Sequence, residues 1–146
     1  MRFGMNVRRR ATILAAALWW GCLTGLGFVA VPVVFASLPG AAIAGPVAAQ
    51  LFTAQSWVSL ACGALLLLLL KGRSATGPTG RERVTLLLVA AGMLLALLVE
   101  YVAAPHIRAR DHLAVWHTAG TAMYVAQWLC AGVVLWRQAG GQASKD

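Results

Sequence analysis

Charged residues are scarce in this 146-residue chain, and acidic residues are the scarcest of all. Only 11% of the residues are charged, four of them Asp or Glu, whereas 60% are hydrophobic. A water-soluble domain averages about 25% charged residues, so this chain has too few polar groups to cover a surface that faces water. The scarcity of charge therefore excludes a soluble globular domain.

Cysteine is rare as well, and its placement gives it no chemical role. Cys22, Cys62 and Cys130 lie in three different apolar stretches. No two of them have the spacing of metal-binding cysteines, and a buried cysteine behaves as a small hydrophobic residue. We therefore expect no disulfide bond, no cysteine metal site and no bound cofactor.

Long apolar stretches are what the chain does contain. Four of them, at roughly 11–36, 46–70, 84–104 and 113–136, have the ~20 residues that a helix needs to cross a bilayer. Runs such as 65–70, six leucines in a row, do not alternate as strands of a membrane barrel do. The sequence predicts one all-α domain over 1–146, an integral membrane four-helix bundle with up-down-up-down topology and a disordered tail at 138–146.

The net charge of +8 would suggest nucleic-acid binding in a soluble chain, but its distribution indicates membrane topology. Ten basic residues lie before the first stretch, between the second and third, and after the fourth. The loop at 37–45 has none, and the loop at 105–112 has Arg108 and Arg110. By the positive-inside rule both termini are cytoplasmic. We expect a multi-pass protein of the cell membrane with the lipid bilayer as its partner and no nucleic acid.

Arginine outnumbers lysine ten to two, and alanine and leucine dominate the composition. This usage is typical of a GC-rich bacterial genome and points to a bacterial inner membrane.

In the first stretch, Gly21 and Gly25 form a small-xxx-small pair on the face that also carries Pro32. Such pairs let another backbone approach closely, so we expect this face to pack against a helix. A homo-oligomer or another membrane protein would be a suitable partner.

Residues 99–117 hold all three histidines and two of the four acidic residues. Pro105 is expected to end the third helix, which would leave Glu100 and His117 each roughly 6 Å inside a helix end. A carboxylate facing lipid is costly, so Glu100 should turn into the bundle. We predict that Glu100 and His117 meet in a hydrogen bond or an ion pair.

A helical wheel of the fourth stretch places four polar or small residues on the same side as His117: Gly120, Thr121, Tyr124 and Gln127. The second stretch adds polar residues in its outer half. Together they form the candidate polar pocket: Glu100, His117, Tyr124, Gln127 and Gln55. Hydrogen bonds between helices, worth about 0.6 kcal/mol each, explain the cluster as well as a site for a small molecule, proton or metal does. The histidine spacing matches no strong metal motif, so no metal ligand is assigned.

Two segments resemble the transmembrane-protein-205-like family of small four-helix membrane proteins. The first, 25–68, carries the run VPVVF at 31–35, an Ala-Gly pair at 44–45 and Phe52. The second, 116–137, is similar to the last helix of that family through His117, Gly120, Tyr124 and Gln127. The resemblance implies four helices in a membrane and carries over no catalytic residue. The turn after Pro39 lacks the charged residue that often precedes the Ala-Gly pair in relatives.

Neither a nucleophile–base pair nor a cluster of carboxylates is present, so we expect no enzyme. A haem or quinone protein is disfavoured because a second intramembrane histidine is missing. The sequence favours a non-enzymatic membrane protein with a structural or accessory role in the cell envelope. The alternative is a small transporter or an ion- or metal-handling protein that uses the polar pocket.

Overall fold

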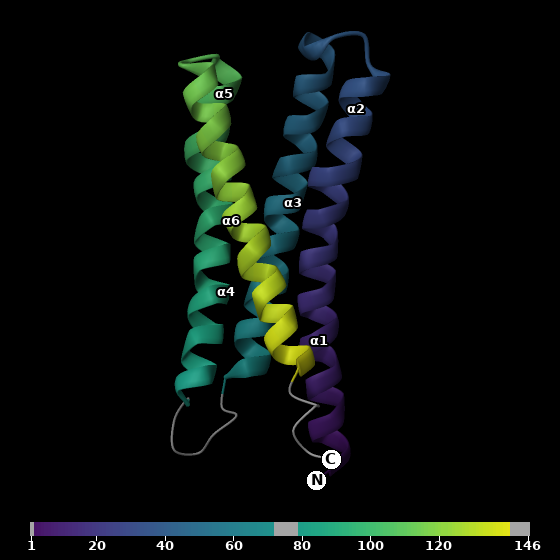
Figure 1. The fold of residues 1–146 in the computed structure, drawn as a ribbon, viewed down its shortest axis with the longest axis vertical. Coiled ribbons are helices and arrows are strands. Elements are labelled where there is room, and N and C mark those ends of the chain that lie inside the picture. Colours follow the sequence, from purple (N-terminus) through teal and green to yellow (C-terminus); the bar gives the residue numbers. More distant parts are fainter. Residues whose placement is uncertain (1, 72–78, 141–146) are drawn as a thin grey trace.

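The computed structural model describes the backbone of residues 2–71 and 79–140, with side chains from Val7 onward (Figure 1). This part of the chain is helical apart from short turns. Four helical spans are long and apolar enough to cross a membrane: Val7–Ser37, Ala41–Leu70, Gly80–Ala109 and Leu113–Ala139. The predicted all-helical membrane protein with four spans is confirmed.

The spans form two helical hairpins. In the first, α1 (Arg2–Gly25), η1 (Leu26–Ala30) and α2 (Val31–Ser37) make the first span, which a short turn joins to α3 (Ala41–Leu70). In the second, α4 (Gly80–Leu98), η2 (Val99–Ala103) and α5 (Ala104–Ala109) make the third span, followed by α6 (Leu113–Ala139). Both turns lie at one end of the bundle, here called the hairpin end, and the opposite end is called the terminal end (Figure 1). The two hairpins separate toward the hairpin end (Figure 1).

Each hairpin begins with a span that contains a proline. Pro32 and Pro105 lack a backbone N–H and remove one helical hydrogen bond. In both spans a five-residue π-helical segment, η1 or η2, ends two residues before the proline. The wider i→i+5 turn shifts the bonding register just before the missing donor, so the helix continues. The expectation that Pro105 ends the third helix was wrong, because that span runs on to Ala109.

Four other boundaries differ from the sequence-based expectation. The first helix begins at Arg2 rather than near residue 11, and the third span begins at Gly80 rather than near residue 84. The second span begins at Ala41 rather than near residue 46, so Pro46 lies inside α3. Gly40 has a φ of 91°, which favours glycine, and its carbonyl accepts hydrogen bonds from the N–H groups of Ile43 and Ala44. At the other end, α6 extends to Ala139 into the predicted tail, and residues 141–146 lie outside the described residues.

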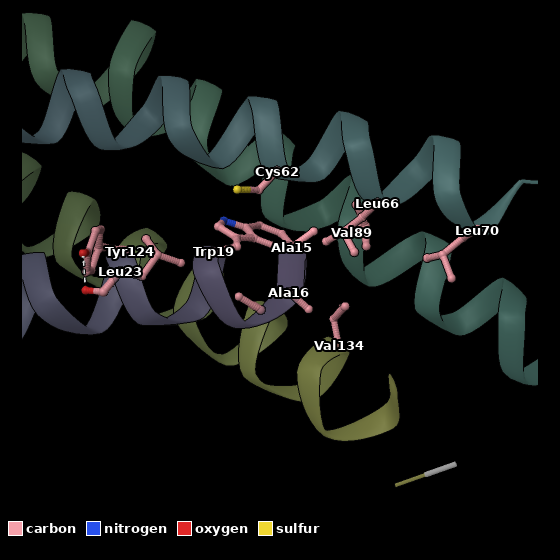
Figure 2. Close-up of a cluster of buried hydrophobic side chains, with 11 residues drawn as sticks. Ala15, Ala16, Trp19, Leu23, Cys62, Leu66, Leu70, Val89, Tyr124 and Val134 are labelled. Atoms are coloured by element: carbon pink, nitrogen blue, oxygen red, sulfur yellow. Dashed lines mark hydrogen bonds between the residues drawn. The ribbon is translucent and has the colours of Figure 1, made fainter. Parts of the chain in front are cut away.

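The aliphatic core lies in the terminal half of the bundle and involves all four spans. Trp19 of α1 is fully buried at its centre, surrounded by Leu23, Leu66, Val89 and Val134 (Figure 2). The indole needs a glycine opposite it, since a Cβ on Gly92 would lie 2.6 Å from its Cη2 atom. The close approach of α4 to α1 therefore requires glycine at position 92, because the Trp19 ring occupies the space that a side chain would take.

The face of the first span predicted to pack against another helix does so only in part, because Thr24 and Phe28 on that face contact Trp128 of α6. Gly21, Gly25 and Pro32 are exposed, and a Cβ on either glycine would meet no atom within 4 Å. The tight contact is made elsewhere, by Gly92 and by Gly27, where a Cβ would lie 2.7 Å from Tyr124 Cε1. A packing role for Gly21, Gly25 and Pro32 thus stays a prediction that requires a second chain.

We predict that Gly92→Ala destabilises the bundle by about 1–3 kcal/mol, because a new methyl group would overlap the buried Trp19 ring. Gly21→Ala is the matched control, since it makes the same change in a helix where the new atom meets open space. Thermal unfolding of the detergent-solubilised protein measures both. Equal midpoints for the two variants would contradict the described contact.

Candidate functional site

Glu100 joins the two hairpins. It lies in the π-helical segment η2 and is half-buried. Its Oε1 atom accepts a hydrogen bond of 3.0 Å from Thr53 Oγ1 on α3. The prediction that this carboxyl group turns into the bundle is consistent with that contact, since a polar partner on another helix removes the cost of facing lipid.

The predicted partner of Glu100 was wrong. Neither a hydrogen bond nor an ion pair joins Glu100 to His117 in the described part of the chain, and His117 is exposed. The reason is depth. Because the third span continues to Ala109, Glu100 lies nine residues, or roughly 13 Å, from its helix end, whereas His117 remains roughly 6 Å from the start of α6.

Tyr124 fastens α6 to the first span. Its side chain is buried, and its hydroxyl donates a 2.7 Å hydrogen bond to the carbonyl of Leu23 (Figure 2). The ring lies over Gly27 and meets the edge of Phe52, with 5.4 Å between ring centroids. The hydroxyl thus satisfies a backbone acceptor next to the π-helical segment η1, which is a structural task.

Gln55 and Gln127 are buried in the membrane-spanning part of the bundle, as the sequence suggested. Gln55 Nε2 donates to Ser59 Oγ at 3.2 Å. Gln127 Nε2 has no acceptor among the described residues, and neither has Trp19 Nε1. The rings of their chain neighbours Trp20 and Trp128 lie 5.8 Å apart, between centroids, and are tilted by 30°, which places the two unpaired donors at one level of the bundle. An unpaired buried donor costs about 1–3 kcal/mol.

The candidate pocket therefore divides into two parts. Gln55, Tyr124 and Gln127 belong to a buried layer, whereas His117 lies at the surface near the hairpin end. Thr121, expected on the inward face, is exposed and donates its hydroxyl to the carbonyl of His117. The wheel was thus right for Gly120, Tyr124 and Gln127, which are buried, and wrong for His117 and Thr121.

A cleft occupies the space between the separating hairpins. It has a volume of about 720 Å³ and lies between α2–α3 on one side and α5–α6 on the other. Most of its wall is apolar or small, and His117 lines it together with Arg108 and Arg110. No hydrogen bond or ion pair joins either arginine side chain to the described residues. Sequence reasoning missed the arginines as site residues, although they are the only basic pair of that loop.

The three histidines do not converge. His106 stacks on Trp116 at 4.1 Å and its Nδ1 atom contacts the Val102 carbonyl at 2.8 Å. His112 Nδ1 pairs with Asp111 Oδ1 at 2.6 Å on the exposed turn. Among residues 2–71 and 79–140, no three His, Cys, Asp or Glu side chains form a group that could hold a metal ion.

The Thr53–Glu100 contact predicts energetic coupling. Thr53→Val and Glu100→Gln should each destabilise the solubilised protein, and the double variant should cost less than the sum by roughly 1 kcal/mol. The cycle of Glu100→Gln with His117→Gln is the control and should be additive within about 0.5 kcal/mol, because the two groups do not touch. Coupling in the second cycle and additivity in the first would reverse the assignment.

The comparison with protein families supplies one match. The sequence profile of a domain of unknown function, DUF4149, matches residues 14–115, which include most of the first three spans and the start of α6. The resemblance to the transmembrane-protein-205-like family is not confirmed by this match. No curated protein and no solved structure matches the chain. Because the matched segment covers well over half of its length, the chain belongs to the DUF4149 family, whose domain has no known function.

Proposed function

We propose that this chain is a non-enzymatic accessory protein of the cell envelope that binds a lipid-like amphiphile in the cleft between its two hairpins. The observation that carries the proposal is the cleft itself. Its volume of about 720 Å³ falls within the 300–1,000 Å³ of small-molecule sites. It opens between helices that are apolar enough to lie in a bilayer, so lipid is the molecule present at its entrance.

The lining of the cleft fits an amphiphile. Phe35, Pro46, Ala49, Ile107 and Leu113 give it apolar walls, and polar side chains border the same space. A molecule with one polar and one apolar part would match both. The lining residues include no Ser, Cys or Lys, and Glu100 is not among them. This chemistry supports binding rather than catalysis.

The basic residues support an orientation for the proposed protein. Ten of them lie before the first span, between the second and third, and after the fourth, and two lie between the third and fourth; this distribution supports cytoplasmic termini and a cleft in the outer half of the cell membrane. The composition supports a bacterial inner membrane. A reporter active only in the cytoplasm should work when fused after residue 146 or inserted after Gly77. Silence of either fusion in a stably inserted protein would contradict this orientation.

A second candidate function, a small transporter, is favoured by one observation. Trp19 Nε1 and Gln127 Nε2 are unpaired donors buried below the cleft, where a polar solute would find partners. This candidate requires solute uptake by reconstituted vesicles that Gln127→Leu abolishes. Metal handling is not pursued, because the described histidines, cysteines and acids do not form a ligand group.

The test of the proposed function blocks the cleft. Ala49 lines it, so Ala49→Trp should fill it and strip bound lipid from the protein. Ala54→Trp is the matched control, because Ala54 lies on the exposed face of the same helix. Native mass spectrometry of the full chain, released from mild detergent, counts the lipids retained. We expect lipid on the unmodified chain and on Ala54→Trp and its loss from Ala49→Trp. Equal retention by all three would overturn the proposal.

A further inference from the structure

The two hairpins carry the same sequence pattern. R-x-R-x-T-[IL]-L occurs at 8–14 and again at 81–87, and [FY]-V-A-x-P occurs at 28–32 and 101–105, each 73 positions apart. In the helices that follow, [LM]-[FY]-x-A-Q occurs at 51–55 and at 123–127, 72 positions apart. Three matches in the same order and at nearly one spacing indicate a repeated hairpin.

The structure repeats in the same register. The π-helical segments Leu26–Ala30 and Val99–Ala103 occupy equivalent positions. Thr12 Oγ1 donates to the Arg8 carbonyl, and its counterpart Thr85 donates to the Arg81 carbonyl. The guanidinium of Arg8 donates to the Leu69 carbonyl near the end of α3, as that of Arg81 does to a carbonyl near the end of α6. The threonine bonds lie within one helix turn, and the arginine bonds join the two helices of each hairpin in the same way.

The repeats face one another across the cleft. Phe52 and Tyr124 are counterparts, and their rings touch. Three further pairs of counterparts line the cleft above them, Phe35 with Arg108, Ala41 with Leu113, and Gly45 with His117. Equivalent residues meet in space only near an axis that relates the repeats. The cleft therefore lies on that axis, which is where paired repeats of membrane transporters place their ligands.

The repeats differ in chemistry at this end. Arg108, Arg110 and His117 of the second repeat replace Phe35, Ser37 and Gly45 of the first. One side of the cleft is thus cationic and the other apolar. In the described part of the chain neither nearby acid forms an ion pair with the arginines, since Asp111 pairs with His112 and Glu100 accepts a hydrogen bond from Thr53.

We infer that the cleft takes a membrane lipid whose phosphate headgroup carries net negative charge. This inference rests on the proposed function and names its ligand class. Arg108 and Arg110 bind the phosphate, because guanidinium groups donate two parallel hydrogen bonds to it. The acyl chains lie against the apolar wall that the first repeat contributes through Phe35 and Ala49. Of the charged and histidine residues in 99–117, Arg108, Arg110 and His117 line the cleft, so one repeat alone binds the headgroup.

The backbone at Arg110 supports a role for its side chain. Its φ of 56° is left-handed, a conformation that costs a non-glycine residue roughly 1–2 kcal/mol. Glycine is the usual residue where a helix ends in this conformation. An arginine kept in this position places a cation at the mouth of the cleft at the expense of stability.

The experiment uses the full chain in an uncharged detergent, titrated with phosphatidylglycerol, with phosphatidylcholine of the same acyl chains, or with inorganic phosphate. The readouts are the unfolding midpoint and the lipids retained in native mass spectra. We expect phosphatidylglycerol to raise the midpoint by several degrees, phosphatidylcholine to act only at about tenfold higher concentration, and inorganic phosphate to have no effect. The variant R108Q/R110Q should bind both lipids alike, whereas R10Q/R83Q removes the same charge at the terminal end and should behave as the unmodified chain.

Arg110→Gly separates binding from folding. It should raise the midpoint of the lipid-free protein, since glycine relieves the left-handed backbone, and lower the affinity for phosphatidylglycerol. Equal binding of both lipids by the unmodified chain, or full retention of the preference by R108Q/R110Q, would overturn the headgroup assignment. If Ala49→Trp still abolishes lipid retention in that case, the proposed function stands without it. An effect of inorganic phosphate equal to that of phosphatidylglycerol would overturn the lipid as ligand.

Discussion

The bilayer interior offers no hydrogen bonds, and this constraint governs each unusual feature of the bundle. Every backbone polar group inside it must find a partner within the protein. Two prolines each remove a donor, and a π-helical segment before each proline keeps the span helical. Tyr124 donates to the Leu23 carbonyl beside one such segment, and Thr53 donates to Glu100 within the other. Two of the hydrogen bonds that join the hairpins thus lie where the spans depart from regular α-helix.

Length and hydropathy were sufficient to predict four spans, because the span length is set by the bilayer and not by tertiary contacts. Helix ends were harder. Proline usually marks an end, and reading Pro105 that way misplaced Glu100 by five residues, or about one and a half helical turns, relative to His117. A π-helical segment has no composition of its own that would have corrected the prediction. The repeated F/Y-V-A-x-P pattern could have done so, since a proline that recurs inside an apolar stretch is a part of the span.

The candidate site was predicted in part for a related reason. Gln55, Tyr124 and Gln127 are buried because they lie deep on faces whose direction a helical wheel gives correctly. His117 lies where the helices have separated, so the inward direction no longer leads to a neighbour. The distance between the two hairpins at each level depends on close contacts at glycines, such as Gly27 with Tyr124 and Gly92 with Trp19. A pattern read along one chain does not show which glycine meets which ring.

The position of the core has a geometric consequence. The largest fully buried apolar side chains belong to the core in the terminal half, where all four spans close around Trp19, and the hairpin end remains divided. The molecule is therefore a wedge whose cross-section grows along the membrane normal. A wedge occupies unequal areas in the two leaflets, so the lipids around it meet a tilted wall instead of a vertical one. The leaflet at the hairpin end must accommodate the wider section, and a curved bilayer does so with less packing stress than a flat one.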